Sequence, residues 1–388
     1  MRIKDLSECR ILIVDDVKAN VDVLVDALRD EYKLSVALDG GNALRQVDKS
    51  PPDLVLLDIV MPGIDGYEVC RRLRASERTR DIPVMFLSSL EDVQNKARGF
   101  EMGANDYLTK PFEILEVKAR VRSLLKAKAY ADAVREAMER DLSIAREIQM
   151  GILPSDLTPC TKGTGLDIHA MMEPAKQVGG DLYEVLRAGD DHVVVVIGDV
   201  SGKGIPAALF MAVTVTLVRS LARQFPDPAE ILRRLNDELV AQNPRGMYVT
   251  MACLVFDLKA GTVTGASAGH NALLLAGPKG PPRPVFPSSG MVAGLFPDRP
   301  FAASTMALAP GETLVLFTDG VTDALNPSGE SFGDDRLVEC LSRLPGKDAN
   351  ETVANLLAAV RGFAAGAPQF DDITILAVRS APQTGGPS

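Results

Sequence analysis

The sequence predicts a two-domain α/β protein with a five-stranded parallel sheet at the N-terminus, a long helix, and an α+β sandwich at the C-terminus. Three observations support this prediction. Short apolar runs alternate with amphipathic stretches of helical length in residues 10–111. Residues 112–150 contain neither glycine nor proline. Strand-like runs return in residues 153–380, with helical stretches segregated from them, which is typical of α+β domains.

Five short runs mark the expected strands of the first domain. Each run is rich in Val, Ile and Leu and is bounded by Asp, Gly, Ser or Pro. A strand-then-helix pattern repeated five times predicts a parallel sheet covered on both faces. The runs are residues 10–14, 33–37, 53–57, 84–87 and 106–108.

The segment 112–152 predicts one long helix, or two close ones. It is rich in Ala, Glu, Lys and Arg, and its apolar or small residues recur mostly at steps of three and four. Such a seam predicts a homodimeric coiled coil, although a helix packed on one of the chain's own domains gives the same pattern. The seam residues are Val121, Leu124, Ala131, Val134, Met138, Leu142, Ala145, Ile148 and Ile152.

The expected strands of residues 153–380 are the runs 193–198, 251–257, 272–275, 313–317 and 373–378. Helical stretches are expected near 205–224, 228–242 and 349–365. The most apolar of these, 205–218, is too short to cross a bilayer and meets Arg219 at once, so we expect a buried core helix. The tail 381–388 is expected to be disordered.

Composition narrows the functional class. The chain has 388 residues and a net charge of −10, which argues against nucleic acid as a partner. Its five cysteines are dispersed and form no CxxC pair, as expected in a reducing cytosol. Only three histidines are present, so carboxylates must hold any metal. We expect a cytoplasmic protein with no membrane or nucleic-acid partner.

Three acidic residues follow predicted strands of the first domain: Asp15, Asp16 and Asp58. The carboxyl ends of parallel strands meet at one edge of a sheet, so these side chains should lie together. Their mutual repulsion predicts a divalent cation, and Mg²⁺ suits oxygen ligands. Ser88 ends the fourth strand and Lys110 follows the fifth. A cation, a hydroxyl and an ammonium around one carboxylate can accept and hold a phosphoryl group.

The segments VDD (14–16), LLDIVMPGIDG (56–66), FLSS (86–89) and YLTKPF (107–112) resemble response-regulator receiver domains across residues 9–125. The resemblance implies a flavodoxin-like fold, Asp58 as the phospho-acceptor and a histidine kinase as the phosphodonor. Mg²⁺ would bind Asp16, Asp58 and the Val60 carbonyl, with Asp15 as the second acidic member. Ser88 would be the switch hydroxyl, Lys110 the phosphate partner and Tyr107 the switch aromatic.

Carboxylates also recur at strand–loop junctions of the C-terminal zone, with glycines beside them that permit close backbone approach. Such a set favours Mg²⁺ or Mn²⁺ over zinc. Two such ions about 4 Å apart can clamp a phosphate and activate a bridging water, without a protein nucleophile. The residues are Asp181, Asp199, Asp319, Asp323, Asp371 and Asp372.

The motifs AREIQMGILP (145–154), GGD (179–181), GDVSGKG (198–204), GHN (269–271), TDG (318–320) and DDIT (371–374) resemble metal-dependent, PPM-type (protein phosphatase 2C-like) serine/threonine phosphatases. The bacterial stress-response and sporulation branch is the nearest. The resemblance assigns the PPM-type domain to 153–380, with 112–152 as its helical linker.

The same resemblance implies that Asp199 bridges two Mn²⁺ or Mg²⁺ ions and that the Val200 carbonyl binds one of them. Asp319 and Asp371 would hold the first ion, and Asp181 would support the second through water. Asp323 and Asp372 are weaker candidates. Glu184 departs from the family pattern, in which Asp is frequent at this position, and we expect structural roles for Lys203 and His270.

These assignments predict a two-component response regulator in which receiver phosphorylation controls hydrolysis of phosphoserine or phosphothreonine on a partner protein. The resemblance implies an anti-sigma-factor antagonist as the substrate and activation by phosphorylation. The alternative is an inactive phosphatase fold that serves as an adaptor for a sigma-factor regulator. A DNA-binding regulator is excluded, because no basic helix-turn-helix follows the receiver.

Overall fold

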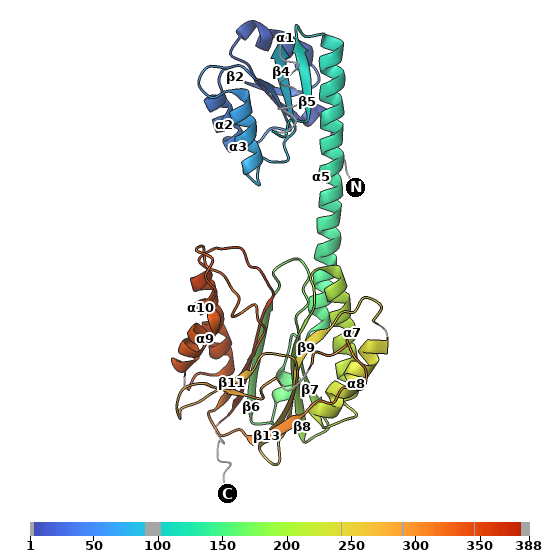
Figure 1. The fold of residues 1–388 in the computed structure, drawn as a ribbon, viewed down its shortest axis with the longest axis vertical. Coiled ribbons are helices and arrows are strands. Elements are labelled where there is room, and N and C mark those ends of the chain that lie inside the picture. The colour runs from blue at the N-terminus through green and yellow to red at the C-terminus, as the bar shows by residue number, and fades with distance from the viewer. Residues whose placement is uncertain (1–3, 90–101, 242, 289–290, 345, 382–388) are drawn as a thin grey trace. The chain divides into compact units, whose positions relative to one another are not determined.

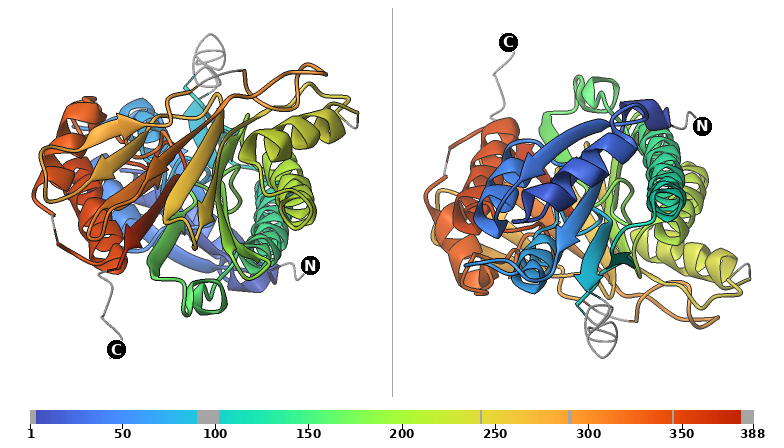
Figure 2. Two further views of the ribbon diagram at one scale, coloured as in Figure 1. Left: turned by 90° about the horizontal axis from the view of Figure 1, so that it is seen from below. Right: turned by 90° about the horizontal axis from the view of Figure 1, so that it is seen from above.

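A computed structural model of the chain describes residues 4–89, 102–241, 243–288, 291–344 and 346–381 (Figures 1 and 2). The chain divides into two compact units, Met1–Asp141 and Leu142–Ser388. One helix, α5 (Ile114–Ile152), begins in the first unit and ends in the second.

The first unit contains a five-stranded parallel sheet, as predicted. The strand order is β2-β1-β3-β4-β5, so the order reverses between β1 and β3, where ligands bind in open α/β sheets. The strands are β1 (Arg10–Val14), β2 (Lys33–Ala37), β3 (Leu54–Asp58), β4 (Val84–Ser89) and β5 (Asp106–Lys110).

Two separate cores cover the two faces of this sheet. On one face, α1 (Lys18–Leu28) and the start of α5 contribute buried apolar residues such as Leu24 and Val121. On the other face, α2 (Gly40–Lys49) and α3 (Gly66–Ala75) contribute residues such as Val47 and Val69. A short 3₁₀ helix, η1 (Leu6–Glu8), precedes β1. The helix expected between the fourth and fifth strands falls on residues 90–101, which lie outside the described residues.

The second unit is the predicted α+β sandwich, built from two five-stranded sheets (Figure 1). One sheet has the order β13-β10-β9-β8-β7 and the other β12-β11-β14-β15-β6. The first contains β7 (Leu182–Ala188), β8 (His192–Val200), β9 (Val249–Asp257), β10 (Thr262–Ala268) and β13 (Ala303–Ala307). The second contains β6 (Leu166–Glu173), β11 (Leu273–Ala276), β12 (Arg283–Val285), β14 (Thr313–Phe317) and β15 (Ile373–Ser380).

Helices cover the outer faces of both sheets. The pair α7 (Ile205–Ala222) and α8 (Pro228–Ala241) packs on the β7–β10 side. The pair α9 (Gly333–Ser342) and α10 (Ala349–Ala364) packs on the β15–β6 side through a second apolar core. The one-turn helix α6 (Thr158–Thr161) contacts β6 and β7. The sequence had indicated α7, α8 and α10 but not α9.

Within the described part of the chain, α7 alone is long and apolar enough to cross a membrane, judged by length and composition. Its buried face, which includes Met211 and Val215, packs on the sheet. The helix continues to Ala222, beyond the expected end at 218, and 33% of it is buried, so the expectation of a short, buried core helix is not confirmed. The opposite face exposes Ile205, Leu209 and Val213. The helix is therefore buried along one face only.

Helix α5 has 39 residues. Among the predicted seam residues, Val121 is buried, whereas Val134, Met138 and Ile148 are between 57 and 63% exposed. These exposed apolar side chains are available for pairing with a second copy. The homodimer stays a prediction.

We predict that Gly265→Ala destabilises the second unit. A Cβ at this position of β10 would lie 2.6 Å from the Phe286 ring and 2.7 Å from Leu254 Cδ2, and overpacking of this kind costs about 1–3 kcal/mol. Gly362→Ala, on the exposed side of α10 with nothing within 4 Å, should instead stabilise by roughly 1 kcal/mol. Thermal unfolding of both variants tests the pair, and equal melting temperatures would refute the packing argument.

Candidate functional site

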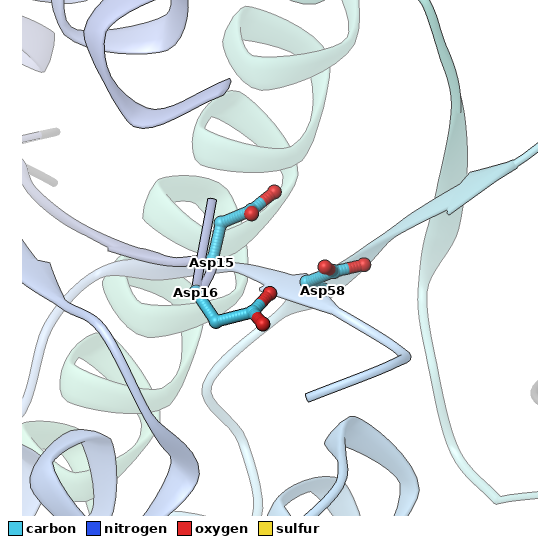
Figure 3. A group of neighbouring side chains, drawn as sticks. All are labelled: Asp15, Asp16 and Asp58. Atoms are coloured by element: carbon cyan, nitrogen blue, oxygen red, sulfur yellow. The ribbon is translucent and has the colours of Figure 1, made fainter. Parts of the chain in front are cut away.

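The first site lies where β1 and β3 end. Asp15, Asp16 and Asp58 each place a carboxylate oxygen within 4.8 Å of the others (Figure 3). Asp15 and Asp58 are buried, whereas Asp16 is exposed. Three hard oxygen donors at this spacing fit a cation such as Mg²⁺. The sequence-predicted carboxylates of the first domain are thus brought together.

Lys110, at the end of β5, supplies the positive charge of this site. Its Nζ lies 2.8 Å from Asp15 Oδ2 and 2.9 Å from Asp58 Oδ2. Burial raises the pKa of Asp58, the hydrogen bond from Lys110 opposes this effect, and the charge of Asp15 adds to it. Burial lowers the pKa of Lys110, but its bonds to Asp15 and Asp58 outweigh that and raise it. Asp58 therefore lies beside an ammonium that could bind a phosphoryl group.

Local hydrogen bonds fix the orientation of these carboxylates. Asp15 Oδ1 accepts the Val17 N–H at 2.8 Å, and the Asn20 amide donates to both oxygens of Asp15. A backbone bond from Val60 lowers the pKa of Asp58, and the Val60 side chain is exposed. Asp15 is thus held by backbone, amide and ammonium together, and Asp16 offers the exposed carboxylate.

Ser88 lies on β4, which pairs with β3, and Tyr107 lies on β5, which pairs with β4. Ser88 is buried, and its hydroxyl has no hydrogen-bond partner among the described residues. The Tyr107 ring is buried 5.5 Å from Phe86, which in turn contacts Tyr67 edge-on at 5.3 Å. The predicted switch hydroxyl and switch aromatic therefore lie on neighbouring strands, with the aromatic in its buried position.

The second site lies in the second unit, where the loop before β7 meets the end of β8. A Cβ on Gly180 would lie 2.6 Å from the Val200 carbonyl oxygen and 3.3 Å from Asp199 Oδ1. Only glycine permits this approach. The GGD loop is therefore pressed against the residues expected to bind metal on β8.

Asp181, the last residue of that loop, is buried. Its Oδ2 accepts two hydroxyl hydrogen bonds, from Thr318 at 2.7 Å and from Thr374 at 2.5 Å. Burial raises the pKa of Asp181 well above its usual value, and the charges of Asp199 and Asp372 raise it further. The two hydroxyls thus fix the position of the carboxylate, while burial and the neighbouring charges make its ionised form unfavourable.

Asp199 is the centre of the electrostatic cluster. Burial raises its pKa to about 7, and the charges of Asp319, Asp371 and Asp372 add to the shift. The pKa of Asp319 is raised by burial and then by Asp371 and Asp323. Mutual repulsion among these carboxylates is relieved by protons or by divalent cations, and carboxylates suit Mg²⁺ or Mn²⁺. Among the residues that the structure describes, no three carboxylates of this cluster lie within 4.8 Å of one another as Asp15, Asp16 and Asp58 do.

Lys203 provides a cation at the edge of this cluster. Its Nζ lies 2.9 Å from Asp371 Oδ2, donates to the Phe370 carbonyl at 2.8 Å and lies 4.1 Å from the centre of the Phe370 ring. The ammonium is therefore engaged by the segment that carries Asp371. Asp323, a weaker candidate, has an exposed side chain and acts on the pKa of Asp319.

Asp372, the other weaker candidate, is an anchor for the GGD loop. Its Oδ1 accepts the Ala175 N–H and its Oδ2 accepts the Gly180 N–H, both at 2.8 Å. A Cβ on Gly179 would lie 2.0 Å from the same Oδ2. Both oxygens of Asp372 are thus engaged by backbone 190 or more residues away in sequence.

Glu184 and His270 have their partners outside the carboxylate cluster. Glu184 is buried and pairs with Arg219 of α7, so its carboxylate is directed to the helix. His270 is buried, with its ring nitrogens against Thr250 Oγ1 and the Phe317 carbonyl. Burial lowers the pKa of His270 to about 4, so the ring is neutral near pH 7.

Three residues of this site were missed by sequence reasoning. Thr318 and Thr374 hold Asp181, and Gln149 of α5 hydrogen-bonds Gly179. The available signal was their position inside the motifs TDG, DDIT and AREIQMGILP. Spacing alone could not show that their side chains turn toward the GGD loop.

Comparison with known families agrees with this two-part geometry. Residues 11–122 match the family described as response regulator receiver domain, and residues 189–381 match stage II sporulation protein E (SpoIIE). The response regulator MprA of Mycolicibacterium vanbaalenii is 38% identical over 156 residues, which make up 38% of this chain and 67% of MprA.

Two further relatives extend into the second unit. Protein IcfG of Synechocystis is 29% identical over 291 residues, which cover 68% of this chain but 44% of IcfG, so the chain spans less than half of that relative. The solved SiaA-PP2C domain of Pseudomonas aeruginosa is 24% identical, with a TM-score of 0.58, and the match covers 64% of this chain and 98% of that domain. This likeness concerns the fold.

We predict that the metal-free second unit loses stability as the pH rises. The pKa of Asp199 is raised from 3.8 to about 7, so folding favours the protonated form. That contribution is complete below the unfolded value of 3.8 and is lost as the pH rises through about 7. The melting temperature in EDTA should therefore fall between about pH 4 and pH 7 and level off above that, and excess Mn²⁺ at about pH 7 should restore it.

Asp199→Asn is the matched control, because its amide cannot ionise. Its melting temperature should depend less on pH than that of the wild type in EDTA. An equal pH dependence in the two proteins would assign the effect to other groups.

Proposed function

The chain belongs to the response regulators and carries a SpoIIE-type phosphatase domain of the PP2C type, and from this premise we propose a signal-gated protein phosphatase. It hydrolyses phosphoserine or phosphothreonine on a partner protein, and phosphorylation of Asp58 controls the rate. The observation that carries the proposal is the carboxylate cluster around Asp199, whose pKa is raised to about 7 by burial and by its neighbours.

Each residue of the cluster has a proposed role in that reaction. Asp199 and the Val200 carbonyl, with Asp319 and Asp371, would hold two Mn²⁺ or Mg²⁺ ions, and Asp181 would support the second ion. Bound ions of this kind clamp a phosphate and lower the pKa of a water. Thr318 and Thr374 keep the Asp181 carboxylate oriented through their hydroxyls.

The receiver is proposed to take its phosphoryl group from a histidine kinase. Asp58, with Asp15 and Asp16 beside it, would bind Mg²⁺, and Lys110 lies 2.9 Å from the acceptor oxygen. The proposed substrate of the phosphatase domain is an anti-sigma-factor antagonist, as the motif resemblance implies. A cytoplasmic location follows from such partners and from the dispersed cysteines.

Regulation is proposed to act through α5. This helix starts four residues after Lys110 and ends two residues before Pro154 of the motif AREIQMGILP, without a break. Its exposed apolar residues Val134, Met138 and Ile148 would pair with a second copy in a homodimer. A change in this pairing, set by Asp58, would alter the metal site at the far end of the helix.

We predict metal-dependent phosphate release from a phosphoserine protein or an aryl phosphate. Wild type should turn over with Mn²⁺ and stop with EDTA, whereas Asp199→Ala should fall to the rate seen without metal, because the bridging carboxylate is gone. Asp190→Ala, an exposed aspartate in the turn after β7, is the matched control and should keep full activity. Absence of turnover in the wild type, with phosphodonor present, would favour the adaptor function instead.

We predict that a small-molecule phosphodonor such as acetyl phosphate raises the phosphatase rate of the wild type. The expected change is about 5- to 150-fold, the usual size of coupling between two sites. Asp58→Asn should keep the basal rate and lose the response. Identical rates for wild type and Asp58→Asn after phosphodonor treatment would contradict the coupling but leave the phosphatase activity standing.

A further inference from the structure

Gln149 is a buried polar residue on an otherwise largely exposed stretch of α5. Between positions 141 and 151, most side chains are half-buried or exposed, and Ile148 next to it is 63% exposed. Gln149 is 3% exposed. A long amide is buried in this way only when its donor and acceptor both have partners, so the position calls for an explanation.

Those partners are the two backbone polar groups of Gly179. Gln149 Nε2 donates to the Gly179 carbonyl oxygen at 2.6 Å, and the Gly179 N–H donates to Gln149 Oε1 at 3.1 Å. A side-chain amide has one face that offers a donor and an acceptor together. Gln149 therefore pairs with the loop in the way a neighbouring strand would.

The same loop is held from its opposite side by Asp372. The Gly180 N–H donates to Asp372 Oδ2, and Gly180 abuts the Val200 carbonyl and Asp199. Residues 179–181 thus lie between the end of α5 and the start of β15. A shift of either partner would move Gly180 and Asp181 relative to Asp199.

Other contacts hold the end of α5 but do not reach this loop. Arg219 donates to the Ile152 carbonyl and pairs with Glu184, and the Tyr183 hydroxyl donates to the Pro154 carbonyl at 3.0 Å. They tie the helix end to α7 and β7. Among the described residues of this unit, Gln149 is the side chain through which α5 hydrogen-bonds the GGD loop.

We propose that Gln149 is a positioning residue through which α5 sets the order of the GGD loop and hence the affinity of the metal site. This inference rests on the proposed function, since it names how regulation reaches that site. When the last turns of α5 are in the position seen here, the amide keeps Gly179 paired and Gly180 against the Val200 carbonyl and Asp199. When they shift, the loop loses one of its two anchors and the metal site is incompletely formed.

The test uses full-length Gln149→Met, which keeps the length of the side chain and removes both hydrogen bonds. Hydrogen–deuterium exchange of the peptide containing residues 178–181, measured in EDTA, should be faster than in the wild type. Binding of Mn²⁺ alone, followed by the electron paramagnetic resonance of the free ion, should weaken about tenfold, as is typical when a supporting group of a metal site is removed.

Gln149→Glu gives a second readout that a purely structural role would not produce. A buried carboxyl has a raised pKa, and its protonated form offers a donor and an acceptor as glutamine does. The deficit in Mn²⁺ affinity relative to the wild type at the same pH should therefore narrow as the pH is lowered from 8 to 6. This variant also tests the proposal if Gln149→Met does not fold.

Glu147→Met, two positions earlier on the exposed side of α5, is the matched control and should leave exchange and Mn²⁺ binding unchanged. Wild-type exchange and wild-type Mn²⁺ affinity in folded Gln149→Met, or a pH-independent deficit in Gln149→Glu, would overturn the proposal. These readouts need no turnover. If the wild type proves inactive, the proposed function is refuted, but exchange and Mn²⁺ binding still test the positioning role of Gln149.

Discussion

Repulsion between buried carboxylates is the constraint on which both sites depend. In each unit the fold brings aspartates from separate strands together and buries some of them, Asp15 and Asp58 in the first unit and Asp181 and Asp372 in the second, which is unfavourable unless countercharges, hydrogen bonds or protons are supplied. The first unit supplies Lys110, which contacts Asp15 and Asp58 at once. The second unit supplies the hydroxyls of Thr318 and Thr374 for Asp181 and leaves Asp199 with a pKa of about 7.

The two units balance the repulsion between their carboxylates in different ways, and each way suits a different reaction. In the first unit the hydrogen bond from Lys110 favours the ionised form of Asp58 against the effect of burial, and an ammonium in this place can also pair with the charge of a phosphoryl group. Around Asp199, by contrast, Lys203 lies at the edge against Asp371. The remaining charge is left for divalent cations, whose binding is coupled to proton release.

Much of this arrangement could be predicted from the sequence, because its informative residues lie at strand ends. The parallel sheet, and the meeting of Asp15, Asp16, Asp58 and Lys110, follow from strand order and from the geometry of parallel strands. The anchoring role of Asp372 could not be predicted, because its partners are backbone groups of Ala175 and Gly180. Backbone partners leave no residue type in the sequence to signal the contact.

Strand β10 shows the same limit in the fold. Its sequence TVTGASA lacks a run of large apolar residues, because Gly265 leaves room for Phe286 of a loop after β12. Helix α9 was also missed, since its sequence GDDRLVECLS is short and polar for most of its length. A strand whose small residues make room for a ring from another part of the chain therefore has the sequence pattern of a loop, and it cannot be predicted before the position of that ring is known.

The two threonine hydroxyls on Asp181 also bear on which ion the second unit would accept. They occupy both lone-pair positions of Oδ2, so Asp181 can present its other oxygen but cannot chelate with both. Calcium commonly takes carboxylates in the two-oxygen mode and tolerates irregular shells of six to eight ligands, whereas magnesium demands a compact octahedron that retains water. With one oxygen available, Asp181 is suited to hold a water of the second ion's shell, as proposed for it above, and is not suited to the two-oxygen mode of calcium, so Thr318 and Thr374 would influence the choice of ion without touching it.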